Sequence, residues 1–172
     1  MLQYLHYGLL AALAIALLFA AFTDWRRRQI DNWLNAAIAL TAPLFWWSSG
    51  LTLWPGVALQ LAMAVAAFVV FATLFALKWM GGGDVKLLVA LALWFPATDH
   101  AYLSLDRTYP YLQLLVIMAV LGGVLTLVMG AWHIARRQKH RLAIPYGLAI
   151  AAAGLWVLSD QYLPAARSAL IG

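Results

Sequence analysis

Charged residues are absent from five long runs of this sequence, and these runs favour a membrane fold. They cover residues 1–23, 32–77, 87–98, 108–135 and 142–159. An α-helix that crosses a bilayer needs about 20 apolar residues. The second run is long enough for two helices, with Gly50 and Pro55 where the chain would turn. We predict an all-α polytopic membrane protein with about six transmembrane helices, at roughly 4–23, 33–49, 56–79, 85–97, 111–134 and 143–160.

The predicted fourth helix is the shortest, and it could be tilted or continue toward residue 103. The composition agrees with a membrane protein, because 66% of the residues are hydrophobic and only 10% are charged. A soluble domain of this size needs more charge to cover its surface. We expect residues 1–172 to form a single transmembrane domain. A net charge of +5 would suggest a nucleic-acid partner in a soluble protein, but here the distribution of the charges argues for lipid instead.

The basic residues predict which side of the membrane each loop faces. Nine of the eleven lie after predicted helices one, three and five, namely Arg26, Arg27, Arg28, Lys78, Lys86, Arg136, Arg137, Lys139 and Arg141. Loops rich in Lys and Arg stay in the cytoplasm. We therefore place these loops in the cytoplasm and the N-terminus outside. The first helix has no basic residues before it, so we expect it to be retained and not cleaved as a signal peptide.

This topology places two carboxylates on the cytoplasmic face, Asp24 after the first helix and Asp84 at the start of the fourth. Asp31 lies on the same face. Each has a structural explanation, because Asp is a favoured helix N-cap: Asp31 would cap the second helix, and Asp84 would cap the fourth after a turn of Gly81, Gly82 and Gly83. However, an ionisable residue at the membrane boundary is costly and usually functional.

Two neighbouring carboxylates can also hydrolyse a peptide bond. Because both cannot ionise easily, one holds a proton and polarises a carbonyl while the other activates water. Helix dipoles favour charge at a helix N-terminus and disfavour it at a C-terminus. We therefore expect Asp84 to ionise readily and Asp24 to keep its proton longer. The three glycines would leave room for an extended substrate backbone. The chain has no Cys, and its four His residues lack ligand spacing, so we expect neither a metal nor a cofactor.

Three segments of the chain resemble the type IV prepilin peptidases, a group of GxGD aspartic proteases. They are "DWRRRQIDNWLN" (24–35), "GGGDVKL" (81–87) and "IPYGLAIAAAG" (144–154). The resemblance implies that Asp24 and Asp84 are catalytic. It also implies substrate-binding or supporting roles for Gly81, Gly82, Gly83, Lys86 and Asn32. Asp31 stands where the family usually has Pro, and an extra acid there would raise neighbouring pKa values.

The chain resembles the short, peptidase-only members of this family, such as those of Flp-type tight-adherence pili. Longer members carry a Cys-rich zinc-binding insertion and also N-methylate their product, so we expect neither zinc nor methyltransferase activity here. The implied substrate is a prepilin or pseudopilin, whose leader would be removed at the cytoplasmic face of the bacterial inner membrane. The sequence leaves the oligomeric state open.

Other interpretations of the same residues remain. One is a broader GxGD intramembrane protease like presenilin, although six helices and the "DVKL" tail favour the prepilin type. Another is a non-enzymatic small transporter, in which Asp84 at a Gly-rich broken helix relays protons or binds an ion. No inverted repeat supports transport. A third is an inactive relative that scaffolds pilus assembly, against which both aspartates argue.

Overall fold

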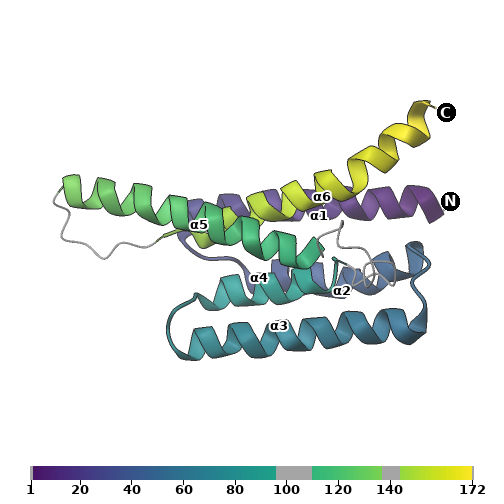
Figure 1. Cartoon of the computed structure of the whole chain (residues 1–172), viewed down its shortest axis with the longest axis horizontal. Helices are drawn as coiled ribbons and strands as arrows, with labels where there is room; N and C mark the ends of the chain where they lie inside the picture. The colour runs from purple at the N-terminus through teal and green to yellow at the C-terminus, as the bar shows by residue number, and fades with distance from the viewer. Residues whose placement is uncertain (1, 96–109, 137–143, 172) are drawn as a thin grey trace.

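The chain folds into a bundle of α-helices that run roughly along one direction (Figure 1). The computed structural model describes residues 2–95, 110–136 and 144–171, with α6 side chains described as far as Tyr162. All six predicted helices are present, and the described residues contain no strand. The elements are α1 (Leu2–Arg27), α2 (Asn32–Ser48), the short π-helical turn η1 (Leu53–Val57), α3 (Ala58–Ala76), α4 (Gly82–Ala92), α5 (Pro110–Ala135) and α6 (Tyr146–Ile171).

Within the described part of the chain, three helices are long and apolar enough to cross a membrane. They are α1, the continuous segment Leu53–Ala76, and α5. By contrast, α2 has 17 residues and α4 has 11. At 1.5 Å per residue, α4 is about 16 Å long, roughly half of the hydrocarbon core of a bilayer. The structure therefore supports a helical membrane protein, and six crossings stay a prediction.

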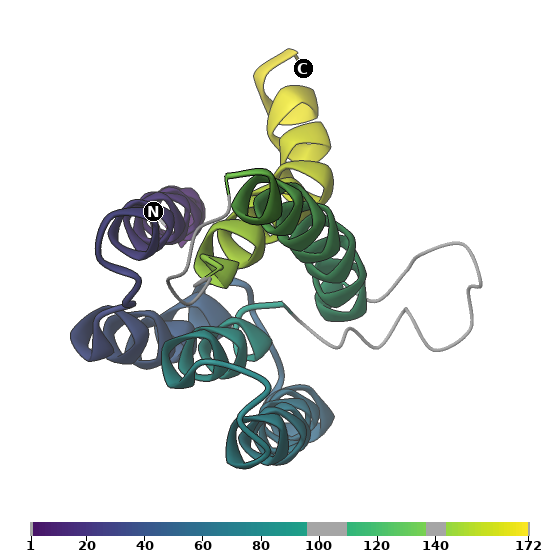
Figure 2. The same cartoon turned by 90° about the vertical axis from the view of Figure 1, so that its left-hand side faces the viewer.

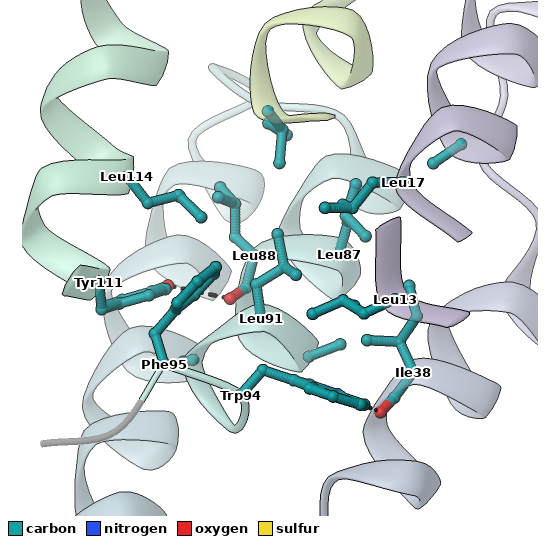
Figure 3. Close-up of a cluster of buried hydrophobic side chains, with 14 of the residues drawn as sticks. Leu13, Leu17, Ile38, Leu87, Leu88, Leu91, Trp94, Phe95, Tyr111 and Leu114 are labelled. Atoms are coloured by element: carbon teal, nitrogen blue, oxygen red, sulfur yellow. Dashed lines mark hydrogen bonds between the residues drawn. The ribbon is translucent and has the colours of Figure 1, made fainter. Parts of the chain in front are cut away.

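Helix α4 lies inside the bundle, in contact with α2, α3 and α6. Its Leu87, Leu88 and Leu91 side chains are fully buried. Figure 3 shows them between Leu17 of α1 and Leu114 of α5. The outer faces of the long helices instead expose large apolar side chains, as expected for surfaces that meet lipid. Because α4 begins at the Gly-rich turn, its central position also places that turn against the neighbouring helices.

The end of α4 is fixed by side chains from other helices. The prediction of a helix over 85–97 was too long, since α4 ends at Ala92. The last carbonyls of a helix need partners. Here the buried Gln60 amide donates to the carbonyls of Ala92 (2.6 Å) and Phe95 (2.9 Å), and the Trp46 indole donates to that of Leu93 (2.7 Å). Residues 96 and 97, and any continuation toward 103, lie outside the described residues.

Two of the basic loops lie at the same end of the molecule. The α1–α2 and α3–α4 connections are both at the left in Figure 1, where α5 also ends. The segments at this end carry Arg26 and Arg27 in the last turn of α1, Lys78 after α3 and Arg136 after α5. This arrangement agrees with the charge pattern that predicts a cytoplasmic face. The remaining basic residues of the fifth loop, Arg137, Lys139 and Arg141, lie outside the described residues.

Candidate active site

A polar cavity of about 450 Å³ at this end of the bundle contains both predicted carboxylates. Its lining comes from the α1–α2 connection and the Gly-rich turn before α4: Asp24, Arg28, Gln29, Ile30, Asp31, Asn32, Gly81, Gly82, Gly83 and Asp84. Asp24 is only 6% exposed, and Asp84 is partly buried. The fold thus brings together two acids that are 60 residues apart in sequence.

The end of α1 is shaped so that Asp24 sits in its last turn. The Arg28 N–H donates to the Asp24 carbonyl (2.8 Å), and Arg28 has a left-handed backbone with φ of 55°. A residue in this conformation commonly closes a helix. The Arg28 backbone turns the chain toward α2. The Arg28 side chain also acts on the site, because its guanidinium charge interacts with the Asp24 carboxylate. The charge pattern predicted only a topological role for the Arg triplet, so the effect of Arg28 on Asp24 is an additional role.

The Asp24 carboxylate is held by the start of another helix. The Gly147 N–H in the first turn of α6 donates to Asp24 Oδ2 (2.8 Å), in a buried hydrogen bond. First-turn N–H groups lack partners in their own helix and favour an anion. A Cβ at position 147 would lie 2.8 Å from Asp24 Oδ2, so the contact requires glycine. Gly147 belongs to the "IPYG" segment, whose sequence did not predict this contact.

Asp84 lies in the first turn of α4 and lines the cavity, so the prediction that it takes the N-cap position of this helix is wrong. Gly81 is the N-cap of α4, and its N–H bonds the Asp84 carboxylate three residues on, as in a capping box. Asp84 lies outside the three membrane-crossing candidates. Burial and the charge of Asp24 raise the pKa of Asp84 to about 7, although the Gly81 bond opposes the shift. The prediction that Asp84 ionises readily is therefore wrong, because burial and a like charge outweigh a helix dipole.

The three glycines of the turn allow close packing. An added Cβ would lie 2.9 Å from Asp84 Oδ2 at Gly81, 3.2 Å from the Phe75 ring at Gly82, and 3.3 Å from Ile30 Cβ at Gly83. Larger residues would thus push the turn away from α3 and from the α1–α2 connection. The same glycines line the cavity, so their predicted role in leaving space for a substrate backbone stays a prediction.

Polar side chains join the two sides of the cavity rim. Lys86 of α4 donates to the Asn32 side chain at the start of α2 (2.7 Å). Asp31 occupies the N-cap position of α2, but its side chain makes no capping bond and instead pairs with Arg27 (2.7 Å). The predicted side-chain cap is therefore wrong, because the Asp31 carboxylate pairs with the arginine four residues earlier in the chain.

Asn35, which sequence analysis missed, lies one turn into α2 and is buried. Its amide nitrogen approaches the Gly83 carbonyl at 3.5 Å, which links α2 to the turn that carries Asp84. Nothing in its sequence context marked it. Within the described residues, no group of three His, Asp or Glu side chains could hold a metal ion. The chemical groups of the cavity are the carboxylates of Asp24, Asp84 and Asp31, the last of which pairs with Arg27, together with two side-chain amides, backbone N–H groups and the Arg28 cation.

The fold and the cavity define a helical membrane protein with a paired acidic site. The model of the type IV leader peptidase family matches residues 11–128, more than half of the chain, and the chain belongs to this family. The protein is therefore a membrane peptidase, in agreement with the resemblance of its motifs. The matched residues include Asp24 and Asp84 but end before Gly147. No curated protein and no solved structure matches the chain.

Proposed function

We propose that this peptidase is an aspartic endopeptidase, in which Asp24 and Asp84 together activate the water that cleaves a prepilin-like substrate. The observation that carries the proposal is the shared cavity, in which burial and then the charge of Asp24 raise the pKa of Asp84, as expected for two carboxylates that share a proton. Family membership favours this function over the small transporter. Gly81, Gly82, Gly83, Asn32 and Lys86 form the wall and rim that support the pair.

The environments of the two acids give them different roles. Asp24, which accepts the Gly147 N–H, is the ionised member and takes a proton from water. The water oxygen attacks the scissile carbonyl carbon while protonated Asp84 gives its proton to the carbonyl oxygen. This addition gives a tetrahedral intermediate with two hydroxyl groups on the same carbon. As its C–N bond breaks, Asp24 passes its proton to the leaving nitrogen, and Asp84 takes back a proton from one of the hydroxyl groups. This reverses the roles that helix dipoles alone predict.

The proposed substrate is the leader of a prepilin or pseudopilin, cut at the cytoplasmic face of the bacterial inner membrane. Membership of the leader peptidase family supports the substrate. The location is supported by the position of the cavity, at the end of the bundle whose segments carry Arg26, Arg27 and Lys78. We place the N-terminus outside, and we propose the peptidase-only activity of Flp-type systems, without methylation or zinc.

Cleavage of a purified prepilin tests the proposal. We expect the wild-type protein to release the leader, and Asp24→Asn and Asp84→Asn to lose detectable cleavage, because Asn can neither accept nor hold the proton. The matched control is Asp160→Asn, an exposed acid far from the cavity that contacts Gln113, which should cleave normally. Cleavage that persists in either cavity variant removes that residue from the mechanism. No cleavage, together with uptake driven by a pH gradient in liposomes, would support transport instead.

A further inference from the structure

A second, apolar cavity lies on the seam between α1 and α2. Its volume is about 130 Å³, and it is lined by Leu9, Ala12, Leu13, Ala16, Ala37, Ile38, Thr41 and Trp94. Figure 3 shows three of these lining residues, Leu13, Ile38 and Trp94, lying near one another, and the Trp94 indole donates to the Ile38 carbonyl (2.7 Å). The Thr41 hydroxyl donates to the Ala37 carbonyl of its own helix (2.7 Å). This cavity, called the groove below, is therefore lined by apolar surface.

The sides of this groove suit the close approach of another helix. Ala12 and Ala16 on α1 face Ala37 and Thr41 on α2 across it, and all four are at least partly exposed. Small side chains let helix backbones approach closely in a membrane. A dry cavity of about 150 Å³ holds a benzene molecule. A groove of this size accordingly has room for one large apolar side chain that projects from such a helix.

The groove and the candidate active site lie along the same two helices. α1 continues from Ala16 to Asp24, and the connection from α1 to α2 lines the polar cavity. Between groove and cavity, Phe19 of α1 meets Trp33 of α2 with ring centroids 5.8 Å apart, and both rings are exposed. Figure 2 shows α1 and α2 side by side at the edge of the bundle away from α5. The seam is therefore open to lipid.

The register of α1 gives a distance from the site to the groove. Ala16 and Ala12 precede Asp24 by 8 and 12 residues, which is about 12 and 18 Å along a helix. A substrate chain that is extended over its first residues after the cleaved bond, and helical beyond, reaches these levels with about six to twelve residues. That segment would lie within the membrane, so the groove requires it to be apolar.

We propose that this groove binds the apolar helix that follows the scissile bond of the substrate. The helix runs antiparallel to α1, seats one large apolar side chain above Trp94, and passes over Phe19 and Trp33 to reach the two aspartates. This inference rests on the proposed function, and it adds the surface, the direction and the register by which a prepilin-like substrate is held.

The absence of Cys from the chain allows a clean cross-linking test. Ala12→Cys and Ala37→Cys place a thiol in the groove, whereas the neighbours Ala11→Cys and Ala36→Cys are exposed on the same helices outside it. Each is combined with Asp84→Asn, so that the prepilin stays intact, and with prepilins carrying one Cys after the cleavage site. We expect disulfides to the groove positions, recurring every three to four substrate residues within the six-to-twelve window, and few to the neighbours.

A kinetic measurement separates this inference from the proposed function. In the active protein, Ala37→Phe fills the groove and should raise KM for prepilin several-fold with kcat retained, whereas Ala36→Phe should change neither. If wild-type protein does not cleave prepilin at all, the proposed function fails first. If it cleaves but the groove positions cross-link no better than their neighbours, or Ala37→Phe leaves KM unchanged, another occupant such as a lipid chain fills the groove and the inference is overturned.

Discussion

Asp84 is the residue that would donate a proton to the substrate in the proposed mechanism. Burial and the negative charge of Asp24 oppose its ionisation, and only the Gly81 N–H favours it. The result is a pKa of about 7, close to the pH at which the protein would work. A general acid is most useful when its pKa lies near the working pH. The cavity thus keeps one carboxyl protonated under conditions in which an ordinary aspartate is ionised.

This raised pKa predicts that the protein is more stable in mild acid. The folded state holds a proton on Asp84 up to about pH 7, whereas the unfolded chain releases it near 3.8. The folded state therefore binds more protons between these values, and the free energy of unfolding falls as the pH rises through this window. Unfolding midpoints in detergent should drop from pH 5 to pH 8 in the wild type and drop less in Asp84→Asn. If Asp160→Asn flattens the profile equally, Asp84 is not the cause.

The residues of the site differ in how far the sequence could reveal them. Asp24 and Asp84 were predictable, because the charge pattern places both on one face. Gly147 was not, because it meets Asp24 across 123 positions and only the packing of α6 against α1 creates the contact. The ready ionisation of Asp84 was predicted wrongly for a related reason. The dipole argument considered each aspartate at its own helix, while the structure adds burial and the start of α6.

Among the helices, α6 positions part of the site through the contacts of its first turn. The Tyr146 hydroxyl lies 3.0 Å from that of Thr126, and its ring packs where a Cβ on Gly122 would stand, at 3.0 Å. These contacts hold the first turn of α6 against α5. Because Gly147 follows directly, the same contacts position the N–H that holds Asp24. A small displacement of α6 would therefore move a carboxylate that belongs to α1.

Gly147→Ala should disrupt the site while leaving most of the fold intact. The added methyl would lie 2.8 Å from Asp24 Oδ2 and 2.9 Å from Ile30 Cδ1, so the carboxylate must move. Displacements of this kind cost up to about 100-fold in rate, and we expect kcat for prepilin cleavage to fall at least tenfold. Gly123→Ala is the matched control, because nothing lies within 4 Å of its added methyl. Equal activity of the two variants would contradict the role given to Gly147.

The existence of each helix was predictable, but the helix ends were less so. Apolar runs and Gly or Pro between them predicted all six helices. The end of α4 could not be predicted from the sequence, because it depends on hydrogen bonds from Gln60 in α3 and Trp46 in α2. The sequence around α4 contains no sign of these distant partners. Helix ends inside a bundle are set by tertiary partners, whereas apolar periodicity is a local property.

At the scale of the whole molecule, the bundle has a basic end that contains the cavity and an opposite end with the α2–α3 connection. We predict that these ends lie on opposite sides of the membrane, with the cavity in the cytoplasm. Single-Cys variants test this, since the chain has no Cys. An impermeant maleimide added to intact cells should label Thr52→Cys but not Trp79→Cys, and should label both after lysis. The reverse pattern would invert the orientation.

The hydrogen bond from Gly147 to Asp24 also has a consequence for biosynthesis. A ribosome makes α1 well before α6, so Asp24 has no Gly147 partner until α6 has been made and inserted. Until then, the carboxylate lacks the N–H that orients it, and the pair with Asp84 is incomplete. If the proposed mechanism holds, the nascent peptidase becomes competent only when α6 docks against α1.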